Sequence, residues 1–241
     1  MGPLEEAARR ALDGVFDPEL DEPVTDLGFV RSLEAADDTI TVHLRLPTSF
    51  CSPNFAYLMA SDAKDALTPL AGTVRVLLDD HHDSEIINRG LAADAGYVGT
   101  FGVEADKDLE ELRLTFRRKA HTAAMERVLS GLLKGDVRQE DLHDVTLADL
   151  PDTAGTRALL ARRAALGLSA DPAARVLVDD HGRSYPREEI PLRLRFARSV
   201  RISIDGNAHF CRGLLRTRYP DSAADQTARA QDHETTEAKA S

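Results

Sequence analysis

The period of the apolar residues changes from helical to alternating and back within the first 80 residues, and this order limits how the N-terminal part can fold. Apolar residues recur at helical spacing from Leu4 to Val15, alternate with polar ones from Thr39 to Leu46, and return to helical spacing after Pro53. The expected elements are a helix over 4–15, strands over 29–35 and 39–46, a helix over 53–70, a strand over 74–78 and a further helix within 79–92.

This order of helix, strand, strand, helix, strand and helix predicts a compact α+β domain. Three glycines within 96–102 place its boundary there, so we expect a first domain over 1–96. Residues 104–219 are expected to form helices and then a small β-rich part, with a hairpin turn at Asp205-Gly206. Residues 220–241 contain almost no apolar side chains, which predicts a disordered tail.

Composition removes several classes of function. The chain has 30 basic and 41 acidic residues, a net charge of −11, which argues against a nucleic-acid partner. No apolar run is long enough to span a membrane, and the N-terminus lacks the apolar core of a signal peptide, so a cytoplasmic protein is expected. Phosphate-binding glycine loops are absent, which argues against an ATPase or a dinucleotide oxidoreductase, and the G-x-S-x-G motif is absent too. No base–nucleophile constellation is visible, so we do not expect an enzyme.

The two cysteines, Cys51 and Cys211, lie far apart in the sequence and outside any C-x-x-C spacing. In a reducing compartment they are expected to be thiols rather than a disulfide. Two cysteines cannot form a closed four-cysteine zinc site. Any bound metal must therefore take further ligands from histidine, carboxylate, a small molecule or a second chain.

Three short motifs follow one another at a defined spacing in the first 51 residues. They are Asp17-Pro18-Glu19-Leu20, Asp26-Leu27-Gly28-Phe29-Val30 and Thr48-Ser49-Phe50-Cys51. In order and spacing they resemble the iron–sulfur cluster assembly domain family, which includes SufT and the phenylacetate-oxygenase accessory protein PaaD. The resemblance covers about residues 4–92. It departs from the family at the cysteine, since Phe50 stands where glycine is usual and Pro53 comes one residue late.

The resemblance implies that Cys51 is the reactive position, and its expected surroundings agree. A thiol between a strand end and a helix N-terminus faces backbone N–H donors and the positive end of the helix dipole, which favour a thiolate. The alternative is an inert, buried cysteine. Thr48 is expected to form a hydrogen bond within the same loop.

Acidic residues in the loops around the start of the expected first strand are candidates for groups near Cys51. Asp17, Glu19 and Asp26 could converge on the thiol as ligands or positioning groups. Equally, Asp26 could cap a turn, while Pro18 and Glu19 could simply end the first helix.

Two further sets of side chains could bind metal. The acidic and histidine-rich stretch 79–83 contains His81 and His82, a set that iron accepts, although such loop ends are commonly solvated helix caps. His209 and Cys211 would share one face of the expected last strand and could join Cys51. The alternative is that both only pack.

The sequence thus favours a non-enzymatic maturation factor that uses Cys51 to carry or deliver an iron–sulfur cluster or iron transiently. The expected partners are a client metalloprotein, such as an oxygenase, and other cluster-assembly proteins. A homodimer in which two Cys51 side chains share one cluster is also considered. The alternatives are an interaction module with an inert Cys51 and a metal-dependent enzyme built on 79–83.

Overall fold

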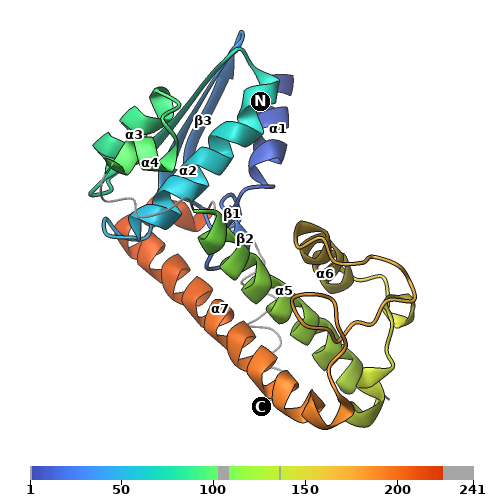
Figure 1. The fold of residues 1–241 in the computed structure, drawn as a ribbon. Coiled ribbons are helices and arrows are strands. Elements are labelled where there is room, and N and C mark those ends of the chain that lie inside the picture. The colour runs from blue at the N-terminus through green and yellow to red at the C-terminus, as the bar shows by residue number, and fades with distance from the viewer. Residues whose placement is uncertain (1, 103–108, 136, 225–241) are drawn as a thin grey trace. The chain divides into compact units, whose positions relative to one another are not determined.

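The computed structural model describes residues 2–102, 109–135 and 137–224 (Figure 1). Its contacts divide the chain into two compact units, Met1–Leu109 with Asn207–Ser241, and Glu110–Gly206. Of the predicted disordered tail, Pro220–Ala224 form the 3-10 helix η6, and the rest lies outside the described residues. The described segment from Asn207 to Ala224 thus belongs to the same unit as the N-terminal elements.

The first unit contains the elements that the apolar periods predict, together with two short strands before residue 24 and a helix over 96–101 that the sequence did not predict. In chain order they are α1 (Pro3–Leu12), β1 (Phe16–Asp17), β2 (Glu22–Pro23), β3 (Val30–Ala36), β4 (Thr39–Arg45), α2 (Pro53–Leu67), the 3-10 helix η1 (Thr68–Leu70), β5 (Thr73–Asp79), α3 (Ser84–Ala92) and α4 (Gly96–Phe101). The predicted α+β arrangement of this part is confirmed.

The main sheet has the strand order β3-β4-β5, with β4 antiparallel to β3 and parallel to β5. Ile40, Val42 and Leu44 of β4 are at most 1% exposed, which confirms the predicted alternation. The turn between β3 and β4 has Asp37 at φ 54°, and the Asp38 carboxylate accepts a hydrogen bond of 2.7 Å from the Gly72 N–H. The hairpin and the start of β5 are therefore tied together.

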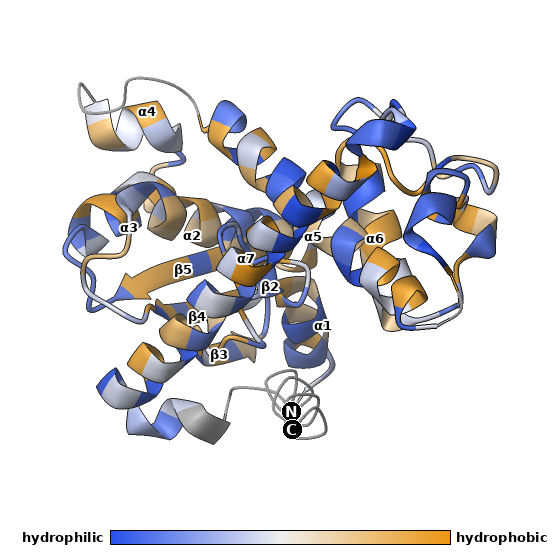
Figure 2. Cartoon of the chain, turned by 90° about the horizontal axis from the view of Figure 1, so that it is seen from below, coloured by the Kyte–Doolittle hydropathy of each residue, from blue (hydrophilic) through white to orange (hydrophobic). Residues whose placement is uncertain are grey.

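Helices bury the apolar side of this sheet. α1 packs against β3 and α2, and α2 packs against β5, where Figure 2 shows a mainly hydrophobic strand. Pro53 begins α2, where its missing N–H leaves no intrahelical hydrogen bond unmade. The sequence Ser52-Pro53 thus fixes where the loop that carries Cys51 ends.

The second unit is mainly helical. Its elements are α5 (Glu110–Leu133), the 3-10 helices η3 (Gln139–His143), η4 (Leu147–Asp149) and η5 (Arg187–Glu189), α6 (Ala154–Ala165) and the first part of α7 (Ile190–Arg218). α5 and α6 lie in the part of 104–219 that the sequence predicts to be helical. Their apolar residues pack around the segments near Leu142 and Val176.

Two basic side chains lie inside this second unit. Arg163 is 1% exposed and donates hydrogen bonds to the carbonyls of Ser169 (2.8 Å) and Arg175 (3.1 Å). His121 is equally buried, and burial, with a smaller contribution from Arg163, lowers its pKa to about 4. His121 is therefore neutral at physiological pH.

The predicted β-rich C-terminal part is wrong, because α7 is one helix of 29 residues. Buried Ile190, Ala197, Ile204 and Ala208 recur at helical spacing, whereas the alternating residues that suggested a strand, such as Phe196, are exposed. The expected turn at Asp205-Gly206 lies inside the helix, where one glycine costs only about 1 kcal/mol.

The apolar run within 175–180, which is part of the region expected to be β-rich, does not form a strand either. Val176, Leu177 and Val178 are buried, yet among the described residues this stretch makes only the isolated bridges Thr146–Arg175 and Val178–Ser184. A continuous apolar run indicates burial, and periodicity alone does not decide whether the backbone is extended, helical or irregular.

Within the described ranges, none of the helices combines the length and the apolar character needed to cross a membrane.

Candidate functional site

The cysteine loop, residues 46–52, joins β4 to α2 and holds Cys51 one residue before the N-cap, Ser52. The Cys51 Sγ lies 3.3 Å from the Thr48 Oγ1, which also accepts a hydrogen bond of 3.3 Å from the Phe50 N–H. Cys51 is half-buried and is not in a disulfide. Thr48 thus fixes the loop around a partly accessible thiol.

His81 binds the backbone of the same loop at Cys51. Its Nε2 donates to the Cys51 carbonyl over 2.8 Å, and its Nδ1 accepts from the Asp83 N–H over 3.1 Å. A carbonyl only accepts and an N–H only donates, so these two bonds assign the proton to Nε2. His81 is buried and uses both nitrogens within the protein, so it positions Cys51 rather than offering a free ligand nitrogen.

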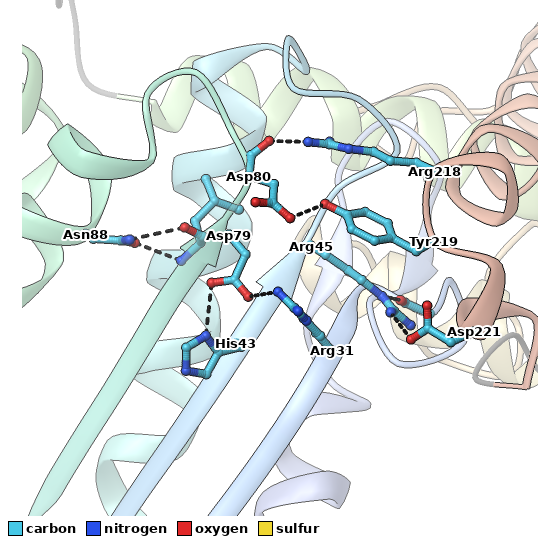
Figure 3. Close-up of polar contacts among 11 residues, drawn as sticks. Arg31, His43, Arg45, Asp79, Asp80, Asn88, Arg218, Tyr219 and Asp221 are labelled. Carbon is cyan, nitrogen blue, oxygen red and sulfur yellow. Dashed lines mark hydrogen bonds and ion pairs between the residues drawn. The ribbon is translucent and has the colours of Figure 1, made fainter.

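The other members of the 79–83 stretch face separate partners (Figure 3). Asp79 accepts from Arg31 (3.0 Å) and lies 2.9 Å from the His43 Nδ1, while Asp80 accepts from the Tyr219 hydroxyl over 2.9 Å. His82 is exposed, with its ring centroid 5.6 Å from that of Phe50. In the part of the chain that the structure describes, no three His, Cys, Asp or Glu side chains are grouped to hold a metal ion.

The acidic loop, residues 17–22, connects β1 and β2. The Asp17 Oδ1 accepts hydrogen bonds from the N–H groups of Glu19 (2.8 Å) and Leu20 (2.9 Å), and Pro18 lies inside this turn. Asp17 is 7% exposed. Burial raises its pKa to about 6, against the opposing effect of the two N–H donors, so the loop contains a buried carboxyl group with an unusual affinity for a proton.

The second motif shapes a turn. Gly28 has φ 76°, a left-handed conformation that favours glycine, and its carbonyl accepts a hydrogen bond of 3.1 Å from the Arg45 Nε. Asp26 is half-buried in the same turn, and the contacts of the described residues do not join it to the cysteine loop. The same holds for Asp17 and Glu19, whose hydrogen bonds among the described residues lie within the acidic loop and to Asn207.

The last turns of α7 belong to the first unit and bind both loops. Asn207 donates to the Glu19 Oε1 over 3.2 Å, and Arg212 is bonded to Glu22. Arg218 donates to the Ser49 Oγ over 2.8 Å and to the carbonyls of Leu46 (3.1 Å) and Asp80. We call Asn207–Arg218 the C-terminal clasp, because it joins the acidic loop, the cysteine loop and the end of β5.

Cys211 lies within this clasp and is half-buried. Burial raises its pKa to about 12, and the negative charges of Asp17, Cys51 and Glu19 act in the same direction. The expected shared strand face with His209 is wrong, because two residues along a helix point to nearly opposite sides. His209 is exposed, whereas Cys211 lies in the electrostatic neighbourhood of Cys51.

Comparison with protein-family models matches residues 5–78 to the iron–sulfur cluster assembly protein family. Residues 5–78 are an iron–sulfur cluster assembly domain. Neither the comparison with curated proteins nor that with solved structures found a match. The family of this assembly domain implies a role in iron–sulfur cluster assembly.

The match covers only part of the site. The assembly domain supplies Cys51, Thr48 and the acidic loop, whereas His81 and the C-terminal clasp lie beyond residue 78. Sequence reasoning did not identify Arg45, Asn207 or Arg218 as supports of the site. The available signal was the spacing of Asn207, Cys211, Leu215 and Arg218, which is helical, but the strand interpretation hid it.

Proposed function

We propose that the protein is a non-catalytic maturation factor that holds an iron–sulfur unit or iron at Cys51 and passes it to a client metalloprotein. The observation that carries the proposal is the support of Cys51, a residue of the assembly domain, by side chains on two sides. Thr48 contacts its sulfur and His81 binds its carbonyl, while the residue stays partly exposed. Thiolates are the usual protein ligands of iron–sulfur clusters.

The exposure of Cys51 suits transfer rather than storage. A carrier must release its cargo, and a client sulfur can attack or replace a ligand only if it can reach the metal. The exposed ring of Phe50, next to Cys51, is 80% accessible and offers an apolar contact for a client surface. The likeness to PaaD supports an oxygenase as the client class.

The competing function is an interaction module in which Cys51 is inert. The exposed Phe50 and the acidic surface fit that reading as well, because neither needs a metal. The two readings differ in one respect, which is whether removing the Cys51 sulfur abolishes iron binding.

We expect anaerobic reconstitution with iron and sulfide to load the wild-type protein and to fail in Cys51→Ala. The physical reason is that alanine removes the soft ligand but leaves the Thr48 and His81 hydrogen-bonding groups in place. Iron and acid-labile sulfide per chain, and the visible absorption spectrum, measure the loading.

His82→Ala is the matched control, since His82 is exposed beside the same loop, and it should load like wild type. Normal circular dichroism of both variants would show that folding is retained. Equal loading of Cys51→Ala and wild type would contradict the carrier function and favour the interaction module.

A further inference from the structure

The clasp places a second thiol on the side of α7 that faces the assembly domain. Asn207, Cys211, Leu215 and Arg218 are separated by four, four and three residues, so they lie along one side of the helix. Asn207 is bonded to Glu19 at one end of this row, and Arg218 is bonded to Ser49 at the other. Leu215 between them is fully buried.

Cys211 therefore lies between a contact to the acidic loop and a contact to the cysteine loop. Ser49 is two residues before Cys51, and Glu19 is two residues after Asp17. The electrostatic influence of Cys51, Asp17 and Glu19 on Cys211 agrees with this position. The two thiols, 160 residues apart in sequence, are thus brought into one neighbourhood within the first unit.

We propose that Cys211 is the second thiol ligand of the Cys51 site, so that one chain holds a thiophilic metal ion or an iron–sulfur unit between two cysteines. This inference rests on the proposed carrier function and adds to it a ligand from outside the matched family segment. The remaining coordination positions are left to sulfide, solvent or a client side chain.

The charge of the site favours such a cargo. The carboxyl groups of Asp17 and Glu19 place acidic charge near Cys211, and acidic charge attracts a cation. A thiol that coordinates a metal gives up its proton to solvent. Binding of one divalent ion by two thiols thus releases two protons and leaves a neutral two-thiolate complex.

The test uses the reduced, full-length protein titrated anaerobically with Co²⁺. We expect one ion per chain, with a sulfur-to-cobalt charge-transfer band of two thiolates, and protection of both cysteines from alkylation by iodoacetamide. Cys211→Ala and Cys211→Ser should each halve the band and weaken binding at least about 10- to 100-fold, since even indirect ligand supports are worth that much.

His209→Ala is the matched control, because His209 is exposed on nearly the opposite side of the same helix, and it should bind Co²⁺ like wild type. Light scattering with bound Co²⁺ should show no ion-dependent dimer. A band that needs Cys51 but not Cys211, with or without dimerisation through two Cys51 side chains, would overturn the inference and leave the carrier function standing.

Reconstitution with iron and sulfide separates the remaining outcomes. Loss of cluster in both Cys51→Ala and Cys211→Ala, with folding retained, would support the two-cysteine site. Loading that neither substitution changes would overturn this inference together with the proposed function.

Discussion

Replacing Arg45 by alanine should lower the free energy of unfolding of the assembly domain by on the order of 3 kcal/mol. The side chain is 1% exposed, and it donates to the Gly28 carbonyl (3.1 Å) and to Asp221 (2.7 Å). Its guanidinium also lies 5.3 Å from the centre of the Tyr219 ring. Alanine would leave a cavity and an unpaired carbonyl, and it would detach η6 from the sheet (Figure 3).

Arg31→Ala is the matched control for this experiment. Arg31 lies on β3 and pairs with Asp79 over 3.0 Å, but its side chain is half exposed, so its removal should cost much less stability than the removal of Arg45. Hydrogen exchange of the β4 amides in increasing urea reports on the first unit separately from the second. Equal effects of the two substitutions would show that the Arg45 contacts contribute nothing beyond a surface ion pair.

Asp17→Asn should raise the free energy of unfolding at pH 7.5 by about 2 kcal/mol. Burial raises the pKa of Asp17 from 3.8 to about 6, which corresponds to about 3 kcal/mol of disfavoured ionisation. Asparagine keeps an oxygen for the Glu19 and Leu20 N–H groups and carries no charge, although its amide N–H groups need partners, which reduces the gain.

The pH dependence of this difference identifies its cause. Between pH 3.8 and about 6 the folded wild type binds a proton that the unfolded chain releases, so wild-type stability falls as pH rises through this window and stays low above it. Urea unfolding at pH 4 and at pH 7.5 should therefore give nearly equal stabilities for the two proteins at pH 4 only. The same gain at both pH values would rule out burial of the charge as the reason.

The α+β part was predictable because its local patterns agree with its tertiary contacts. In β4 the apolar residues that alternate with polar ones in the sequence are also the buried ones. Pro53 stands at the first position of α2, where proline is favoured. The positions of Cys51 and Thr48 followed from this order of elements. The motif Asp17-Pro18-Glu19 was identified, but its burial was not, because burial depends on contacts with distant segments.

The C-terminal helix was not predictable from alternation. In the segment from Ile190 to Ile204, apolar and basic residues alternate as in a strand, yet the buried set is Ile190, Ala197 and Ile204. Ala197 contributes little to the apolar pattern because its side chain is small, although it is buried against neighbouring elements. The ion pairs Arg193–Glu189 and Arg201–Asp205, each four residues apart, were the stronger evidence for a helix.

The bond between Arg45 and Asp221 joins residues 176 positions apart, and this separation has a consequence during synthesis. A ribosome adds about 5–20 residues per second, so the last strand of the sheet, which ends at Asp79, is made roughly 7 to 28 seconds before Asp221. During that interval Asp221 is not yet available to bind the Arg45 guanidinium. The hydrogen bonds from Asn207 to the acidic loop and from Arg218 to the cysteine loop are also not yet formed. In a nascent chain the loop that carries Cys51 thus has fewer hydrogen bonds than in the finished protein. The site is complete only after the last turns of α7 have been synthesised.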